Sequence, residues 1–169
     1  MIRVENRNEF LFVLKGFLPK KCLMVEIGVL YGDFSQMILD IIDPGTLYLI
    51  DPYGVNADND IREVQDELYG RNQMKTAYSI LQTMTINPFQ RSYSYNAARI
   101  FADEIIDAAY IDSCHKYKST KEELRLYLPK LKSGGLMCGH DYNIPGVKQA
   151  VDEFMKEHNF EMVLLNENG

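Results

Sequence analysis

Acidic and histidine side chains follow two apolar stretches in the second half of the sequence. Asp112 and His115 come after the stretch that begins at residue 105, and His140 and Asp141 follow GGLMCG. Burying an acid is costly unless it is paired or binds a cation, so acids that close apolar stretches indicate function more than packing. If the two stretches are neighbouring parallel strands, both groups reach one crevice at the carboxyl edge of a sheet.

The chemistry expected of this cluster is proton transfer, metal binding or both. An imidazole titrates near neutral pH, so His115 is the candidate general base beside Asp112. Two carboxylates brought close repel one another, and a divalent cation relieves the repulsion, which makes Asp112 and Asp141 candidate ligands of Mg²⁺, Mn²⁺ or Ca²⁺. His140 is the candidate third ligand. The alternative is that His140 turns into the core and Asp141 caps the helix at Pro145, so that Asp112 and His115 act without a metal.

A turn bracketed by glycines follows the first apolar stretch. In VEIGVLYGDFS, Gly28 and Gly32 bracket a turn that opens a helix, so backbone amides and the positive helix end can face a ligand. Asp51 ends the second apolar stretch, where an acid can accept hydrogen bonds from both hydroxyls of a ribose. These features predict a nucleotide-like ligand, although Leu30 departs from the dinucleotide fingerprint G-x-G-x-x-G. The alternative is a plain tight turn, with Asp51 a turn residue before Pro52.

The elements that must position these residues alternate between short apolar stretches and segments of helical period. We expect strands at 22–27, 46–51, 88–94, 105–112, 134–141 and 160–165, of which the third is the weakest. We expect helices over 7–15, between the first two strands, from a capping box at Ser119 and Thr120 to Pro129, and from Pro145 to His158. Residues 52–87 are too long for a plain connector and are expected to cover a site. The fold class is therefore α/β, a doubly wound and mainly parallel sheet with helices on both faces and 22–27 at its centre.

Length and composition limit the class of protein. With 169 residues, 46% of them hydrophobic and 25% charged, the chain is expected to form one globular domain over 1–169. A net charge of -6 without a basic run argues against nucleic acid as the main partner. The three cysteines are spread along the chain and are expected to be free thiols. No apolar stretch approaches the ~20 residues that cross a bilayer, and the start MIRVENRNEF lacks the apolar block of a signal peptide, so we expect a cytoplasmic protein without membrane contact.

As a set, these motifs resemble the class I S-adenosylmethionine-dependent methyltransferases, in particular the small group of methyltransferase family 24 whose fourth strand is followed by Asp-x-x-His-x-Tyr. Here that motif is Asp112, His115 and Tyr117. VEIGVLYGDFS resembles the cofactor loop of the family, LYLIDPYG its ribose-binding strand, and residues 111–142 with PGVKQAVDEF its later half. The resemblance implies a Rossmann-like methyltransferase sheet that usually ends in a hairpin. Because this chain stops at NENG soon after FEMVLL, either the sequence is truncated or the sheet is one strand short.

The resemblance also implies a cofactor and the residues that hold it. S-adenosylmethionine would be held by residues around its methionine, ribose and adenine parts: Glu26, Gly28, Val29, Gly32, Ser35 at the carboxylate, Asp51 at the ribose, Ser94 near the adenine, and Asp112. Members of the group often hold a divalent cation between the acids after the fourth and fifth strands, here Asp112 and Asp141.

The function that the resemblance implies is methyl transfer to a hydroxyl or amine of a small molecule. The expected partners are that methyl acceptor and, in a homodimer, a second copy of the chain. The alternatives are a non-catalytic binding or partner protein of this fold and, less favoured, an NAD-dependent oxidoreductase.

Overall fold

The computed structural model describes residue 4 and residues 6–52, 89–90 and 92–164. The helical pattern expected within 53–87 lies outside these residues. No helix among those described is long and apolar enough to cross a membrane. All three cysteines are free thiols, as predicted.

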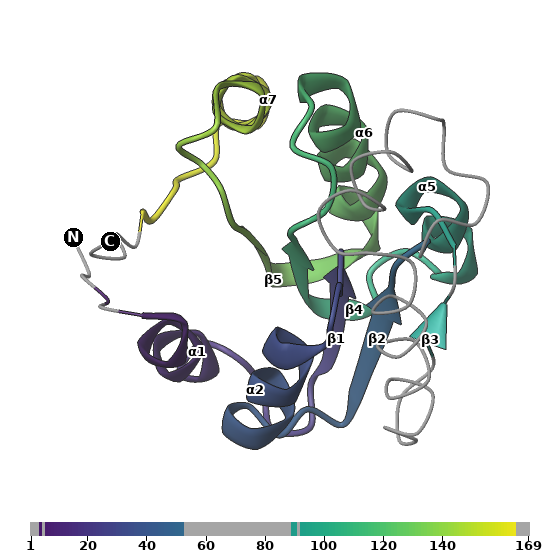
Figure 1. The fold of residues 1–169 in the computed structure, drawn as a ribbon, viewed down its shortest axis with the longest axis vertical. Helices are drawn as coiled ribbons and strands as arrows, with labels where there is room; N and C mark the ends of the chain where they lie inside the picture. The colour runs from purple at the N-terminus through teal and green to yellow at the C-terminus, as the bar shows by residue number, and fades with distance from the viewer. Residues whose placement is uncertain (1–3, 5, 53–88, 91, 165–169) are drawn as a thin grey trace.

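A parallel sheet forms the centre of the described fold (Figure 1). Its order is β3-β2-β1-β4-β5, and every neighbouring pair is parallel. The strands are β1 (Leu23–Ile27), β2 (Thr46–Ile50), β3 (Phe89–Gln90), β4 (Ile106–Ile111) and β5 (Leu131–Gly139). The predicted α/β class, and the central place of the first strand, are therefore confirmed.

The register of the sheet brings the chemically interesting residues to one edge. Ile27 at the end of β1 lies opposite Ile50 of β2 and Ile111 of β4, and Ile111 lies opposite Gly139 of β5. The residues that follow these four positions therefore emerge side by side at the carboxyl edge, where ligands bind in open α/β sheets.

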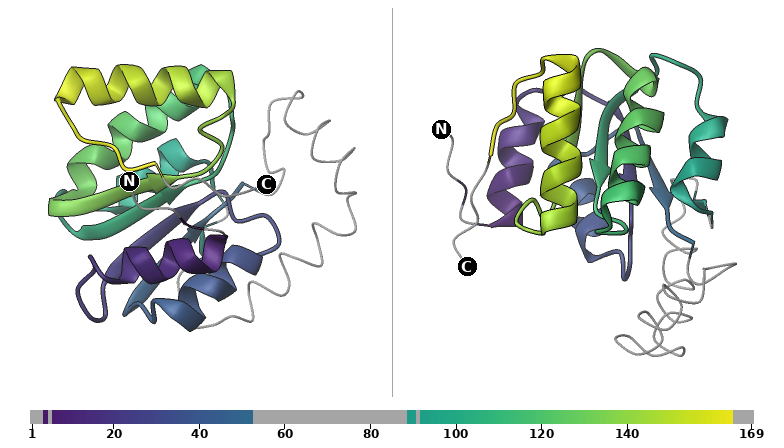
Figure 2. Two further views of the ribbon diagram at one scale, coloured as in Figure 1. Left: turned by 90° about the vertical axis from the view of Figure 1, so that its left-hand side faces the viewer. Right: turned by 90° about the horizontal axis from the view of Figure 1, so that it is seen from above.

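Helices cover both faces of the sheet, as expected from strands that are apolar on both sides (Figures 1 and 2). On one face, α1 (Arg7–Lys15) and α2 (Asp33–Ile41) pack against β1, β2 and β4. On the other, α5 (Ser94–Ala97), α6 (Tyr117–Tyr127) and α7 (Pro145–His158) form the second core. Adjacent residues of one strand alternate between these two cores.

The predicted start of the third helix was wrong. α6 begins at Tyr117, two residues before the expected capping box, and its N-cap Lys116 makes no side-chain cap hydrogen bond. The Thr120 hydroxyl instead donates back to the carbonyl oxygens of Cys114 and Lys116. Pro129 lies in a short 3-10 turn after α6, so the predicted helix end is confirmed.

Two predicted strands also differ from the structure. Of the described residues in the expected strand at 88–94, only Phe89–Gln90 form a strand, and Ser94 opens α5. Residues 160–164 form no strand, because none of the described strands takes their backbone hydrogen bonds. Apolar composition favours a strand but does not supply a partner for it.

Candidate active site

The glycine turn packs directly against the end of β4. The amide of Gly28 donates to the carbonyl oxygen of Ile50 over 2.9 Å. Its φ is +87°, and a Cβ there would overlap the carbonyl oxygen of Asp112 and lie 2.8 Å from Cα of Ser113. Gly32 has φ +82° and caps the N-terminus of α2. The backbone conformation of the turn therefore favours glycine at both positions.

Asp51 directly follows β2 and holds this turn. Its Oδ2 accepts hydrogen bonds from the amides of Val29 over 2.9 Å and Leu30 over 3.2 Å. Leu30 has a left-handed φ of +53°, which these bonds help to stabilise. The carboxylate is therefore in place beside the predicted cofactor turn, and its contact with a ribose stays a prediction.

Glu26, the penultimate residue of β1, is a buried acid beneath the turn. Burial raises its pKa to about 8, the charges of Asp112 and Asp51 act in the same direction, and a hydrogen bond from Ser35 opposes them. That bond runs from the Ser35 hydroxyl to Oε2 over 2.6 Å. Burial therefore favours the protonated form of the Glu26 carboxyl. Ser35 is itself fully buried, and its predicted contact with a cofactor carboxylate stays a prediction.

The acids after β4 and β5 meet around His115. The Nε2 atom of His115 lies 2.8 Å from Oδ2 of Asp141 and 3.7 Å from Oδ1 of Asp112. One donor atom from each of these three residues lies within 4.8 Å of the others, a spread that one divalent cation could bridge. The sequence prediction that Asp112 and Asp141 share one crevice agrees with this geometry.

His140 lies outside this three-residue group. Its Nδ1 is 3.1 Å from Oδ1 of Asp141, the oxygen that does not face His115. Among the described residues, the group whose geometry could hold a metal is Asp112, His115 and Asp141, so the third member of the group is His115. The predicted use of His140 as a ligand receives no support from this grouping. The Asp141 carboxylate meets the two histidines with different oxygens, Oδ2 with His115 and Oδ1 with His140.

Arg7 reaches the site and was missed in the sequence. It is the first residue of α1, its Nη2 lies 3.5 Å from Oδ2 of Asp112, and its guanidinium lies 5.2 Å from the ring centre of Phe34. The pattern Asn6-x-x-Glu9 does signal a helix start, and Asn6 accepts the amide of Glu9 in the structure. Nothing in that pattern shows where the helix start lies relative to β4.

Glu123 is a second residue that the sequence did not single out. It is a buried acid on α6, and Ser113, the residue after Asp112, donates to both of its oxygens at 2.7 Å. Burial raises its pKa, and hydrogen bonds from Ser113 and Ser94 oppose this. Ser94, the predicted adenine contact, is thereby joined to the loop after β4 through one carboxyl group.

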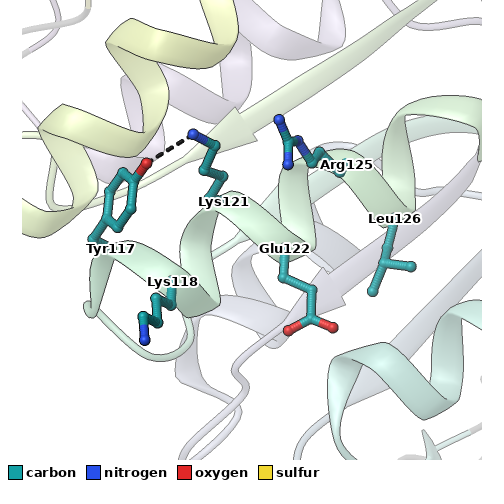
Figure 3. A pocket seen from close by; sticks show the side chains of 6 residues that line it. All are labelled: Tyr117, Lys118, Lys121, Glu122, Arg125 and Leu126. Atoms are coloured by element: carbon teal, nitrogen blue, oxygen red, sulfur yellow. Dashed lines mark hydrogen bonds between the residues drawn. The ribbon is translucent and has the colours of Figure 1, made fainter.

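Tyr117 links helices and lies outside the acid cluster. Its hydroxyl donates to Glu153 of α7 over 2.6 Å and accepts a hydrogen bond from Lys121 over 2.7 Å. A shallow depression of about 290 Å³ lies beside this group along α6, and its lining residues are Tyr117, Lys118, Lys121, Glu122, Arg125 and Leu126 (Figure 3). None of the predicted catalytic, cofactor or metal residues lines it.

Similar solved structures share this fold. A protein of Streptococcus mutans, assigned as a methyltransferase and solved with S-adenosylhomocysteine, has 16% identity and a TM-score of 0.61 over 93% of this chain and 84% of that chain. The TDP-rhamnose 3'-O-methyltransferase of calicheamicin biosynthesis has 16% identity and a TM-score of 0.59 over 94% and 72%. A protein of Clostridium thermocellum assigned as an rRNA methylase has 13% identity and a TM-score of 0.60 over 92% and 82%. At these identities the likeness shows the fold alone.

The family comparison reaches further than the fold. No curated protein matches the sequence. A family model described as a methyltransferase domain matches residues 25–142, which include the end of β1, the glycine turn and both acid groups of the cluster. Because this match covers most of the chain, the chain belongs to the methyltransferase domain family. Its sheet has the Rossmann-like fold of the class I methyltransferases.

Proposed function

We propose that the protein uses S-adenosylmethionine to methylate a hydroxyl or amine group of a small molecule. The observation that carries this proposal is the position of His115, whose Nε2 lies between two carboxylates at the same sheet edge as the glycine turn. The family match and the neighbour solved with S-adenosylhomocysteine support the cofactor.

The residues around the glycine turn fit this cofactor by charge and shape. Gly28 brings the turn against β4 where a side chain could not fit, and Asp51 holds the turn amides in place. Asp51 and Asp112, whose charges both act on Glu26, form an acidic surrounding that suits a ligand with positive charge on its sulfur and its amine. The bound cofactor supplies a methyl group on a sulfonium, which an oxygen or nitrogen nucleophile can attack.

His115 has the geometry of a general base oriented by an acid. With a proton on Nε2, the imidazole donates to Asp141 over 2.8 Å, and Nδ1 is then the nitrogen that accepts a proton from the methyl acceptor. Asp141 and Asp112 stabilise the positive charge that forms on the ring. The side chain of His115 is 44% exposed, so an acceptor molecule can approach it.

A divalent cation is the second way in which the same three side chains could act. Asp112, Asp141 and His115 would hold it, and the ion would supply Lewis acidity that lowers the pKa of an acceptor hydroxyl. The two roles of His115 exclude one another, because Nε2 is the atom near both carboxylates and cannot both bind a metal and donate to Asp141. Because two of the three donors are carboxylates, we propose Mg²⁺, Mn²⁺ or Ca²⁺ as the ion.

A small molecule is the favoured acceptor, although one neighbour is assigned as an rRNA methylase. The net charge of -6 and the acids around the site oppose the approach of a phosphate backbone. The neighbour that acts on TDP-rhamnose shows that this fold accommodates a sugar hydroxyl. A homodimer stays a prediction.

Calorimetric titration with S-adenosylhomocysteine, with and without Mg²⁺, tests the cofactor and the metal together. Turnover is then followed as release of S-adenosylhomocysteine from S-adenosylmethionine with a panel of nucleotide sugars and phenols, and with an rRNA fragment. We expect binding of S-adenosylhomocysteine, no binding of NAD, and turnover with a small molecule. Binding of NAD instead would favour an oxidoreductase, and binding without turnover on any acceptor would favour a non-catalytic protein.

A further inference from the structure

Arg7 places a positive charge at the cofactor end of the site. The residue opens α1, and its side chain reaches across to the end of β4, where Nη2 lies 3.5 Å from Oδ2 of Asp112. The guanidinium stacks over Phe34 at 5.2 Å, and the Phe34 ring in turn contacts Tyr110 of β4 with 4.4 Å between ring centres. The guanidinium therefore has a defined position above an aromatic floor, although it stays 37% exposed.

The charge of Arg7 acts on the acids beneath the glycine turn. Its positive charge lowers the pKa of Glu26, against the burial and the acids Asp112 and Asp51 that raise it. Arg7 is thus within electrostatic reach of Glu26 as well as Asp112. The site combines several acids with a guanidinium, which is the pattern that complements a ligand carrying both an ammonium and a carboxylate.

The amino-acid end of S-adenosylmethionine is such a ligand, and its carboxylate needs donors. Ser35 is fully buried and hydrogen-bonded to Glu26 over 2.6 Å, so its hydroxyl is not accessible to a ligand carboxylate. The planar fork of an arginine matches a carboxylate with two parallel hydrogen bonds. The 3.5 Å contact of Arg7 with Asp112 is longer than a charge-assisted hydrogen bond, so the guanidinium can shift to a better partner.

We propose that Arg7 binds the carboxylate of the cofactor and makes the protein select carboxylate-bearing ligands over their decarboxylated counterparts. The inference rests on the proposed use of S-adenosylmethionine. Arg7 is a specificity-determining residue on this account, and it takes no part in proton transfer.

The test is a pair of titrations with S-adenosylhomocysteine and with decarboxylated S-adenosylhomocysteine, which differ only in the carboxylate. Wild-type protein is compared with Arg7→Met, which keeps an apolar stem over Phe34, and with Arg7→Lys, which keeps the charge but loses the fork. Arg125→Met is the matched control, because it removes another arginine that pairs with a carboxylate, Glu157 of α7, at 3.0 Å. Thermal unfolding of each variant checks that the fold is retained.

We expect wild-type protein and Arg125→Met to bind the carboxylate ligand roughly tenfold to a hundredfold more tightly than the decarboxylated one. In Arg7→Met the ratio should fall to within about threefold, mainly through weaker binding of the carboxylate ligand, and Arg7→Lys should lie between. An unchanged ratio in Arg7→Met, or an equal loss for both ligands, would overturn the inference while the proposed function stands. Failure of wild-type protein to bind either ligand would overturn both.

Discussion

The charge state of Glu26 predicts an unusual dependence of stability on pH. Burial raises the pKa of this carboxyl from 4.5 to about 8 in the folded protein, with Ser35 as the opposing hydrogen-bond donor and the charges of Asp112 and Asp51 acting in the same direction as burial. At pH values between these two pKa values, the native protein keeps a proton on Glu26 that the unfolded chain releases.

The direction and the magnitude follow from proton linkage. Because the native state binds more protons in this interval, the contribution of Glu26 is fully present below pH 4.5 and is lost as the pH rises through about 8. At about 1.4 kcal/mol per pH unit, the interval corresponds to about 5 kcal/mol of unfolding free energy. Relaxation and water entry reduce such penalties, so we expect a decline of about 2 to 5 kcal/mol.

Urea unfolding at a series of pH values from about 5.5 to about 8.5 measures this decline. Glu26→Gln keeps an oxygen that can accept the Ser35 hydrogen bond, but its side chain does not titrate. The free energy of unfolding of this variant should therefore rise relative to that of the wild type as the pH increases. Glu122→Gln is the matched control, the same chemical change at an exposed position of α6, and should follow the wild type. Equal slopes in the wild type and Glu26→Gln would refute the assignment of a buried, neutral carboxyl.

Four further variants test other parts of the site. Gly28→Ala should lower the free energy of unfolding in urea by about 3 kcal/mol or more, through backbone strain and overlap with the end of β4. The control Gly134→Ala should cost about 1 to 2 kcal/mol from strain alone, because Gly134 has φ +79° and a Cβ there would have no atom within 4 Å. Similar costs for the two variants would contradict the overlap. Asp51→Ala should weaken S-adenosylhomocysteine binding by about 1 to 3 kcal/mol in calorimetry, and unchanged affinity would remove this carboxylate from the site. His115→Gln should lower turnover by about 10²- to 10⁴-fold with little change in cofactor affinity, and full wild-type turnover after dialysis against EDTA would exclude the metal route. Tyr117→Phe should lower the free energy of unfolding by about 1 kcal/mol, because the Tyr117 hydroxyl joins α6 to α7. Turnover should stay near that of the wild type, and a loss of turnover would contradict this structural role.

The residues at strand ends could be predicted well because their position depends on local order. Apolar stretches that end in Gly28, Asp51 and Asp112 become parallel strands, and parallel strands deliver their last residues to one edge. The same argument failed for residues 160–164, which have the composition of a strand and no partner among the described strands.

The members of the acid cluster could be predicted only in part. Asp112 and Asp141 follow neighbouring strands, so their proximity was readable from the sequence. Which histidine joins them depends on how the loops after β4 and β5 pack together: one oxygen of Asp141 meets His115 and the other meets His140. The spacing of residues along the sequence does not contain that arrangement.

By itself, the sequence determined the α/β class, the mainly parallel sheet with its first strand at the centre and the chemical types gathered at one edge, because each depends on periodicity and on what ends a strand. The tertiary structure alone decided which side chains are partners. Arg7 meets Asp112 across more than a hundred positions, Ser35 turns its proton to Glu26, and Tyr117 of the motif binds α7. Such contacts depend on how helices lie on the sheet, and helix packing is set by the whole core rather than by any local stretch.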